Sequence, residues 1–221
     1  ILFDAGPPGT TMGLSVIETS SAGCPSAAGS AKVQVDFLDV PPSHPFHDFV
    51  DTIARNSITA GCGAGDYCPD SPVTRAQMAV FLLRAEHGSS YAPPACSGLF
   101  TDVSCPGGFA VDWIEQLSIE GITAGCGGGN YCPGDPVTRA QMAVFLLRAE
   151  HGSGYTPPAC TPPGIFGDVQ CPVGFAVDWI EQLYTEGVTG GCSVSPLLYC
   201  PDGPNTRGQM AVFLTKTFGL Q

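Results

Sequence analysis

The hydrophobic residues of this chain follow two helical patterns, one after the other. Ala110, Trp113, Ile114 and Leu117 are spaced at i, i+3, i+4 and i+7, the positions that share one face of an α-helix. The segment 142–147, by contrast, is apolar at every position. A helix that is apolar nearly all round is stable only when protein surrounds it. The pattern therefore predicts an amphipathic helix followed by a buried helix.

The residues at the ends of these patterns predict where the helices begin and end. Thr138 is followed three positions later by Gln141, the sequence of a capping box, so the buried helix is expected to begin after Thr138. Gly152 is expected to end it. Gly121 is expected to end the amphipathic helix, because glycine readily adopts the left-handed conformation that closes many helices.

The helix pair recurs along the chain. Residues 72–89 and 136–153 are identical (PVTRAQMAVFLLRAEHGS), and so are residues 109–117 and 175–183 (FAVDWIEQL). The period is about 64 residues, longer than that of the common solenoid repeats. A unit used repeatedly favours a binding or assembly role over a single catalytic centre, so we predict that the chain is not an enzyme.

These repeats predict a mainly α fold. The buried helices, which begin at Thr74, Thr138 and Thr206, are expected to pack together at the centre, with the amphipathic helices outside them. Residues 1–35 lie outside the repeats and alternate polar with apolar positions, for example in 32–37. Such alternation predicts short strands or an extended arm, either on its own or as the end of a preceding domain. Ile1 is not an initiator methionine, and we expect a processed or partial chain.

The composition excludes some partners. Only 13% of the residues are charged, and the formal net charge is −12. The chain therefore has no basic stripe that could displace counterions from phosphates, and we expect no nucleic-acid partner. No apolar run approaches the roughly 20 residues that span a bilayer, so we expect no membrane span.

The eleven cysteines predict a secreted, oxidised protein. Ten of them form five local pairs that follow the repeat: Cys62/Cys68, Cys96/Cys105, Cys126/Cys132, Cys160/Cys171 and Cys192/Cys200. Zinc is the alternative, but the spacing within the repeats varies between C-x5-C and C-x7-C, which disfavours a metal site. We predict disulfides, no metal and no cofactor. Cys24 has no partner in this scheme.

The repeated motifs resemble the S-layer homology family. That family repeats an opening F-x-D-V, a helix led by an aromatic residue, a G-I-x-x-G turn and a second helix that begins T-R-A-E. The turns here are 121–125 and 187–191, with Ser57 in place of the first glycine of repeat one. The remaining matches are Phe37/Asp39, Phe100/Asp102 and Phe166/Asp168 for the opening, Phe49, Trp113 and Trp179 for the aromatic position, and 74–77, 138–141 and 206–209 for the helix start.

The resemblance implies a pseudo-threefold bundle of three helix–loop–helix repeats that anchors a secreted protein to the cell envelope. We expect the repeats at residues 36–95, 96–160 and 161–221. Members of the family bind an anionic, often pyruvylated, cell-wall polysaccharide in grooves between repeats. This chain departs from the family in having glutamine for the glutamate of T-R-A-E, and a cysteine pair in the loop that often carries Asp-Gly.

The arginines at the helix starts are the strongest candidate ligand residues. Arg75, Arg139 and Arg207 occupy the same repeat position. There the free backbone amides and the helix dipole favour an anion, and the guanidinium fork suits a carboxylate. The alternative is a structural pair with the opening aspartates, Asp39, Asp102 and Asp168.

Other candidate residues carry a structural alternative too. Trp113 and Trp179 suit a sugar ring but also the core. Gly125 and Gly191 allow a close approach of ligand, or serve only as helix caps. The paired carboxylates Asp112/Glu115 and Asp178/Glu181 are expected to lie on a solvated face and not in a glycosidase site. His87 and His151 are expected to complement helix C-termini.

The sequence as a whole predicts a non-catalytic, extracellular module of the cell surface that binds envelope polysaccharide. The rival hypothesis is a self-assembling subunit of an extracellular fibre or surface layer, in which the N-terminal arm docks on a neighbouring copy. Cys24 and the alternating N-terminal segments favour the rival, and the three Thr-Arg positions favour the anchor.

Overall fold

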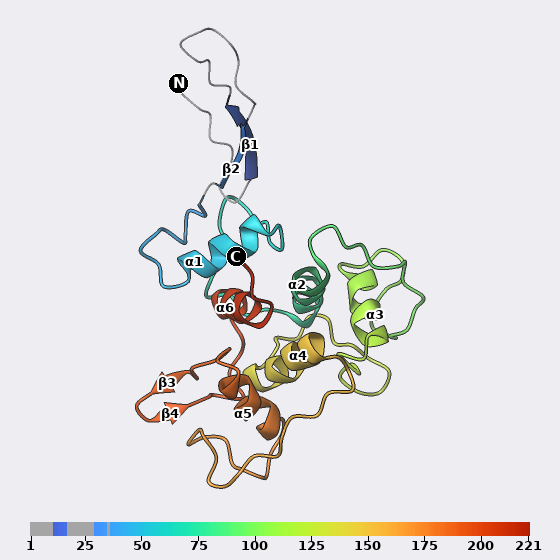
Figure 1. Ribbon diagram of the computed structural model, residues 1–221. Helices are drawn as coiled ribbons and strands as arrows, with labels where there is room; N and C mark the ends of the chain where they lie inside the picture. The colour runs from blue at the N-terminus through green and yellow to red at the C-terminus, as the bar shows by residue number, and fades with distance from the viewer. Residues whose placement is uncertain (1–10, 17–28, 35) are drawn as a thin grey trace.

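The computed structural model describes residues 11–16, 29–34 and 36–221. It is rich in helix, as the sequence predicts (Figure 1). The first helices of the repeats are α1 (His47–Arg55), α3 (Val111–Ile119) and α5 (Val177–Thr185), and the second helices are α2 (Arg75–His87), α4 (Arg139–His151) and α6 (Arg207–Thr217). The strands are β1 (Thr11–Val16), β2 (Gly29–Gln34), β3 (Ser193–Val194) and β4 (Leu197–Leu198).

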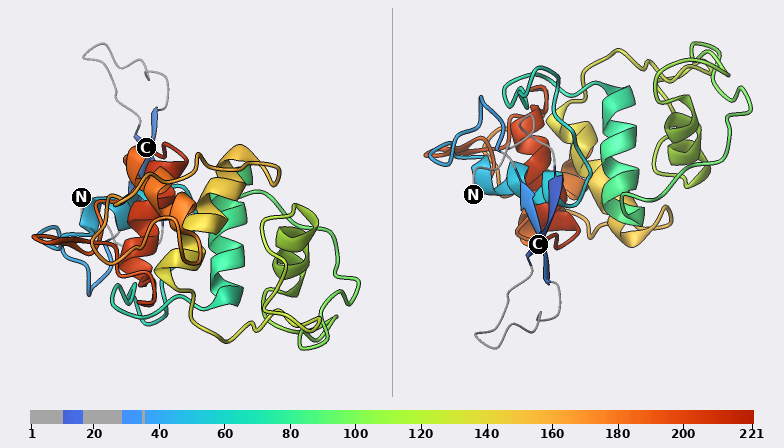
Figure 2. Two further views of the ribbon diagram at one scale, coloured as in Figure 1. Left: turned by 90° about the horizontal axis from the view of Figure 1, so that it is seen from below. Right: turned by 90° about the horizontal axis from the view of Figure 1, so that it is seen from above.

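The second helices form the centre of the molecule. α2, α4 and α6 contact one another (Figure 2). Most of their apolar side chains are buried. Each begins with the expected capping box: the threonines at 74, 138 and 206 accept a hydrogen bond from the backbone of the glutamine three residues later, whose side chain accepts one in return. On the outer helix α3, Ile114 and Leu117 are fully buried, as the amphipathic pattern predicts.

A closed ring of backbone hydrogen bonds joins the segments that precede these three helices. The amide of Val73 donates to the carbonyl of Asn205 at 2.9 Å, the amide of Asn205 donates to Val137 at 2.8 Å, and the amide of Val137 donates back to Val73 at 2.9 Å. Each segment thus satisfies one buried polar group of the next. The ring fixes the starts of α2, α4 and α6 relative to one another.

Each first helix packs on the second helix of the preceding repeat. α3 packs on α2 and α5 packs on α4, while α1 closes the circle by packing on α6 at the other end of the chain. The main-chain oxygen of Gln221, the last residue, accepts a hydrogen bond from the side chain of Asn56 after α1. The packing units therefore differ from the sequence repeats, since each combines helices from two of them.

Five disulfides cross-link the loops and links between these helices. They join Cys62 to Cys68, Cys96 to Cys105, Cys126 to Cys132, Cys160 to Cys171 and Cys192 to Cys200. These are the five pairs that the cysteine spacing predicts. Cys24 lies outside the described residues.

The described part of the N-terminal segment forms one pair of strands. β1 and β2 are antiparallel, with Thr11 opposite Gln34 and Val16 opposite Gly29. The rest of the predicted arm, residues 1–10, 17–28 and 35, lies outside the described residues. Within the described ranges, no helix has the length and apolar character that a bilayer crossing requires.

Candidate functional site

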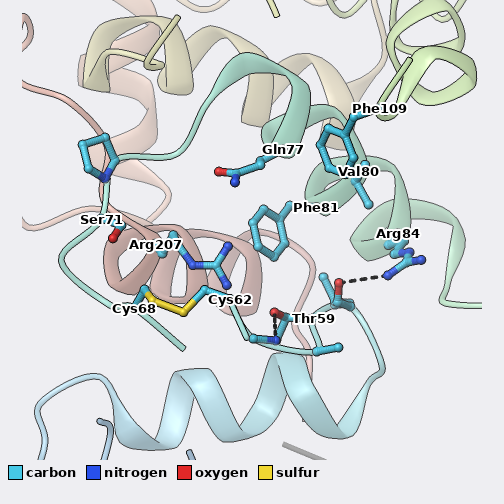
Figure 3. Close-up of a pocket in the computed structure, with 14 residues that line it drawn as sticks. Thr59, Cys62, Cys68, Ser71, Gln77, Val80, Phe81, Arg84, Phe109 and Arg207 are labelled. Atoms are coloured by element: carbon cyan, nitrogen blue, oxygen red, sulfur yellow. Dashed lines mark hydrogen bonds between the residues drawn. A yellow bond between two sulfur atoms is a disulfide. The ribbon is translucent and has the colours of Figure 1, made fainter. Parts of the chain in front are cut away.

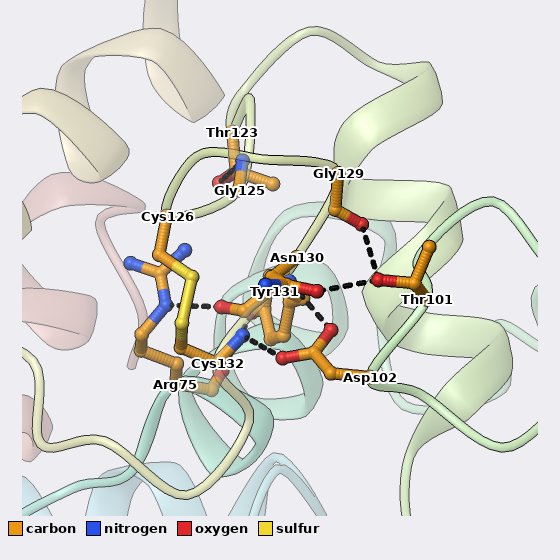
Figure 4. The surroundings of a disulfide bond; sticks show 10 residues. All are labelled: Arg75, Thr101, Asp102, Thr123, Gly125, Cys126, Gly129, Asn130, Tyr131 and Cys132. Atoms are coloured by element: carbon orange, nitrogen blue, oxygen red, sulfur yellow. Dashed lines mark hydrogen bonds between the residues drawn. A yellow bond between two sulfur atoms is a disulfide. The ribbon is translucent and has the colours of Figure 1, made fainter.

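A tyrosine in each cysteine loop is clamped between an opening aspartate and a helix-start arginine. In Figure 4 the backbone amides of Tyr131 and Cys132 donate to the two carboxylate oxygens of Asp102, each at 2.7 Å. On the other side, Nε of Arg75 donates to the carbonyl of Tyr131 at 2.7 Å, and the tyrosine hydroxyl donates to the backbone carbonyl of Arg75 at 2.7 Å. The clamp therefore ties repeat two to the start of α2 in repeat one.

The same clamp occurs at the other two positions. Asp39 and Arg207 hold Tyr67, and Asp168 and Arg139 hold Tyr199, with hydrogen-bond distances of 2.7–2.8 Å. The sequence offered a direct arginine–aspartate pair as the alternative to ligand binding. The structure corrects it: both side chains bind the same tyrosine backbone, and in the described part of the chain no carboxylate lies within ion-pair distance of these three arginines.

The guanidinium groups of the three helix-start arginines are buried, and not all of their N–H donors form hydrogen bonds. Arg75, Arg139 and Arg207 are only 4–5% exposed. Their charge rests on aromatic faces, with the Arg207 guanidinium carbon 4.7 Å from the Tyr67 ring centre and 5.2 Å from that of Phe81. In each of the three, Nη2 has no hydrogen-bond partner among the described residues. A buried unpaired donor is costly, so these atoms are suited to receive an acceptor.

A cavity opens between repeat one and α6 at Arg207 (Figure 3). It has a volume of about 510 Å³ and is lined by the loop 58–62, by Arg207, by Gln77 and Arg84 of α2, and by Phe109 from repeat two. Phe109 is 70% exposed, and Val80 lines the wall beside it. The cavity thus combines a buried cation, a second cation at its edge, an amide and an accessible aromatic ring.

A related cavity of about 260 Å³ opens beside Arg139. Its lining includes Gln209 and Lys216 of α6 and Gly191 of the loop in repeat three. Nη1 of Arg139 donates to Oε1 of Gln209 at 3.2 Å. These residues correspond in the repeat to Gln77, Arg84 and Gly61 of the larger cavity. We call the two cavities the Arg207 groove and the Arg139 groove.

Burial shapes the ionisation of the clamp. Desolvation lowers the pKa of Arg139 and Arg207 from its ordinary value, although Tyr199 and Asp168 oppose this at Arg139. Desolvation would raise the pKa of Asp102, but the hydrogen bonds from Tyr131 and Cys132 outweigh it, and the pKa of Asp102 lies below its ordinary value.

The turn glycines are required by close packing within the protein. Gly125 and Gly191 have φ of 85° and 84°, and a Cβ atom at either position would lie 2.3 Å from a loop carbonyl oxygen and 3.0 Å from a phenylalanine ring. Gly191 also lines the Arg139 groove. The glycines therefore have a structural role whether or not a ligand approaches them.

The tryptophans line neither groove, and each packs against an arginine. Trp113 and Trp179 are partly buried against the core. The guanidinium carbon of Arg84 lies 5.3 Å from the Trp113 ring centre, and that of Arg148 lies 5.4 Å from Trp179. Each tryptophan thus positions a cation, and at Arg84 that cation borders the Arg207 groove.

The sequence-based prediction for two carboxylates was wrong. Glu115 and Glu181 were expected on a solvated face, but they are only 3% and 9% exposed. Glu115 accepts hydrogen bonds from the backbone of Ser97, Gly98 and Leu99 and from the Ser97 hydroxyl. The link between repeats folds back over the helix, and it buries a carboxylate that the helical pattern alone would leave in water.

Sequence reasoning also missed several groove residues. Gln77 and Gln209 were assigned only to helix capping. The groove cations Arg84 and Lys216 and the clamped Tyr67, Tyr131 and Tyr199 were not singled out. The glutamines, the cations and the tyrosines each recur at one position of the repeat. That recurrence was the signal that could have identified them.

Comparison with known proteins identifies the repeats. The S-layer homology domain matches residues 36–79 and 100–143. The chain is 34% identical over 115 residues to a "Cell surface protein" of Thermoanaerobacter kivui, covering 51% of this chain and 15% of the relative. It is 33% identical over 103 residues to the "Middle cell wall protein" of Brevibacillus brevis (45% and 9%) and 30% identical over 122 residues to "Exoglucanase XynX" of Acetivibrio thermocellus (55% and 11%).

The chain spans 15% or less of the length of these relatives, so the match concerns one module of larger proteins. S-layer homology domains are non-catalytic anchoring modules, and the match to an enzyme covers only a small share of that enzyme. The family and the wall-protein relatives assign the chain to the extracellular cell surface. Residues 36–79 and 100–143 of this chain are thus S-layer homology domains, and these matches support a cell-envelope anchoring module.

Proposed function

We propose that this module attaches a secreted protein to the cell envelope by binding an anionic cell-wall polysaccharide in the Arg207 and Arg139 grooves. The three helix pairs act as one pseudo-threefold bundle, with repeats at residues 36–95, 96–160 and 161–221. The observation that carries the proposal is the buried guanidinium at each groove, whose Nη2 has no partner among the described residues.

The charges favour an acidic ligand locally in a chain that is acidic overall. The formal net charge is −12, yet each groove combines a buried arginine with a second cation, Arg84 in one and Lys216 in the other. A carboxylate or pyruvyl acetal could accept a charge-assisted hydrogen bond from the arginine. The long-range field repels acidic polymers, so binding must depend on contacts inside the grooves.

The groove walls suit a sugar. Gln77 in one groove and Gln209 in the other offer amide groups beside the arginine. The exposed ring of Phe109 provides an apolar surface at the mouth of the Arg207 groove, against which the C–H face of a pyranose can pack. This combination of fixed cations, an amide and an aromatic ring supports a carbohydrate over a purely apolar ligand.

The test is co-sedimentation of the purified chain with cell-wall sacculi. The groove-edge variants Arg84→Gln and Lys216→Gln remove a cation without disturbing the tyrosine clamp, and together they should weaken binding at least tenfold. Arg55→Gln is the matched control, because Arg55 pairs with Asp51 on the surface of α1 and lines neither groove. Equal binding by the groove double variant and the control would refute the proposal.

A further inference from the structure

Two clusters outside the grooves each combine one histidine with two glutamates. At the ends of α2 and α3, Nε2 of His87 lies 3.0 Å from Oε1 of Glu120 and 3.9 Å from Oε2 of Glu86. At the ends of α4 and α5, Nε2 of His151 lies 3.0 Å from Glu186 and 3.7 Å from Glu150. In each cluster the three ligand atoms lie within 4.8 Å of one another.

An ion pair between histidine and glutamate does not account for the whole cluster. The imidazole Nε2 carries at most one proton and donates to one carboxylate at a time. One buried carboxylate oxygen in each cluster has no hydrogen-bond partner among the described residues: Oε2 of Glu86 in the first and Oε2 of Glu186 in the second. Each cluster therefore holds more acceptor oxygens than its histidine can satisfy.

The surrounding side chains hold these groups in place. Nε2 of Gln116 donates to Oε1 of Glu120 at 2.7 Å, and Gln182 does the same for Glu186. The ring of His87 packs 4.4 Å from that of Tyr91, and His151 packs 4.3 Å from Tyr155. Orientation of ligands by outer hydrogen bonds and packing is typical of metal sites.

We propose that each cluster binds a divalent cation of the zinc type through the histidine Nε2 and one oxygen of each glutamate. Zinc bonds to nitrogen and oxygen at about 2.0–2.2 Å, which places neighbouring ligands roughly 3–3.5 Å apart. The observed distances need a shift only of Glu86 or Glu150. The imidazole favours zinc over calcium or magnesium, which prefer oxygen ligands alone. The side chains are 20–33% exposed, so an ion has access from solvent.

Such an ion joins the second helix of one repeat to the first helix of the next. It does so at the α2–α3 and α4–α5 contacts and not at the α6–α1 contact. There Asn56 occupies the position of Glu120, and Phe218 occupies the position of Glu86. The described residues therefore hold two such sites. This inference does not depend on polysaccharide binding.

The test is isothermal titration of the full chain with zinc chloride after removal of metals with a chelator. We expect two ions per chain, one in His87→Gln or His151→Gln, and binding at least 100-fold weaker in the double variant. His47→Gln is the matched control, because His47 also lies beside two carboxylates, Asp36 and Asp48, yet should leave the stoichiometry at two. Calcium chloride should bind far more weakly than zinc.

Two sites that persist in the histidine double variant, or the absence of any zinc binding by the unaltered chain, would overturn the proposal. If the histidine variants fail to fold, Glu86→Gln combined with Glu150→Gln tests the same sites while keeping each imidazole and its nearest glutamate. That pair should weaken zinc binding at least tenfold. An unchanged affinity would show that the clusters are ordinary ion pairs.

Discussion

The α2–α3 contact and the α6–α1 contact occupy equivalent places in the molecule but are built differently. α2 and α3 are consecutive in the chain, and their link carries the Cys96–Cys105 disulfide. α6 and α1 come from opposite ends of the described helical region. Their contact depends on Phe46, which packs against Gly208, and on the hydrogen bond from Asn56 to Gln221. The α2–α3 contact is thus held by a disulfide-bonded link between consecutive helices. The α6–α1 contact is held by side-chain packing and a hydrogen bond.

The two contacts differ in the residues that stand at two equivalent positions of the repeat. Gly208 corresponds to Ala76 of α2, and Phe46 corresponds to Ala110 before α3. A Cβ at Gly208 would lie 2.3 Å from the Phe46 ring. Alanine therefore stands at both positions in the repeats that form the α2–α3 contact, whereas glycine and phenylalanine stand there and pack together at the α6–α1 contact.

The largest effect is expected from breaking the linked contact at Glu115. Glu115→Gln leaves the amides of Ser97, Gly98 and Leu99 with a poorer acceptor, and it should lower the free energy of unfolding by roughly 1.5–3 kcal/mol. The matched variant is Glu181→Gln, whose carboxylate accepts a backbone bond from Ile165. Urea unfolding of both should show the smaller loss for Glu181. An equal loss would mean that the link contributes no more in repeat two than in repeat three.

The free energy of unfolding should also fall at acid pH, because Glu115 becomes protonated. Desolvation would raise the pKa of Glu115, but hydrogen bonds from Ser97, Leu99 and Gly98 lower it below its ordinary value. A lowered pKa in the folded state means that the stabilisation is complete above the unfolded pKa of about 4.3 and is lost as pH falls through the folded pKa. Urea unfolding between pH 7 and pH 3 should show a steeper loss in the unaltered chain than in Glu115→Gln. Parallel curves would contradict this assignment.

The closing contact should be sensitive to Gly208→Ala. The added methyl group overlaps the Phe46 ring, and overpacking of this kind costs about 1–3 kcal/mol. In a Phe46→Ala background the ring that the methyl group overlaps is absent, so the cost of Gly208→Ala should fall by at least about 0.5 kcal/mol. A double-mutant cycle by urea unfolding measures this coupling. A coupling of zero would place Phe46 outside the contact.

The smallest effect is expected at the chain end. Asn56→Ala removes the bond to Gln221, at 3.1 Å, and a bond to the carbonyl of Thr52, at 2.9 Å. Because the site is partly exposed and water can replace these bonds, the loss should be about 0.5–1 kcal/mol. Thermal unfolding should detect it as a small drop in Tm. A loss of unfolding free energy as large as that of Gly208→Ala would mean that the bond to Gln221, and not the packing of Phe46, contributes most to the α6–α1 contact.

Much of the fold could be predicted from local sequence. The capping boxes at Thr74, Thr138 and Thr206, the buried stripe of α3 and the five cysteine pairs all depend on residues close in sequence. The burial of Glu115 and the bond from Arg75 to Tyr131 could not be predicted in this way. They depend on how one repeat folds against the next, and helical periodicity carries no information about that contact.

The ligand-binding roles of the candidate site residues stay predictions. Arg139 and Arg207 line the grooves and Arg75 lines neither, but all three arginines hold the tyrosine loops, so alanine substitution tests structure and binding together. The cations at Arg84 and Lys216 separate the two roles. Self-association through the N-terminal arm stays a prediction, which deletion of residues 1–30 followed by light scattering would test.

The most direct test of the groove account is an NMR titration that observes arginine side chains. The chain, labelled with ¹⁵N at arginine, would be titrated with an acidic polysaccharide fragment released from the cell wall. The account predicts saturable shifts of the Arg139 and Arg207 guanidinium signals and no shift at Arg55, which lies on the surface of α1. Binding of the fragment without shifts at Arg139 and Arg207 would contradict it.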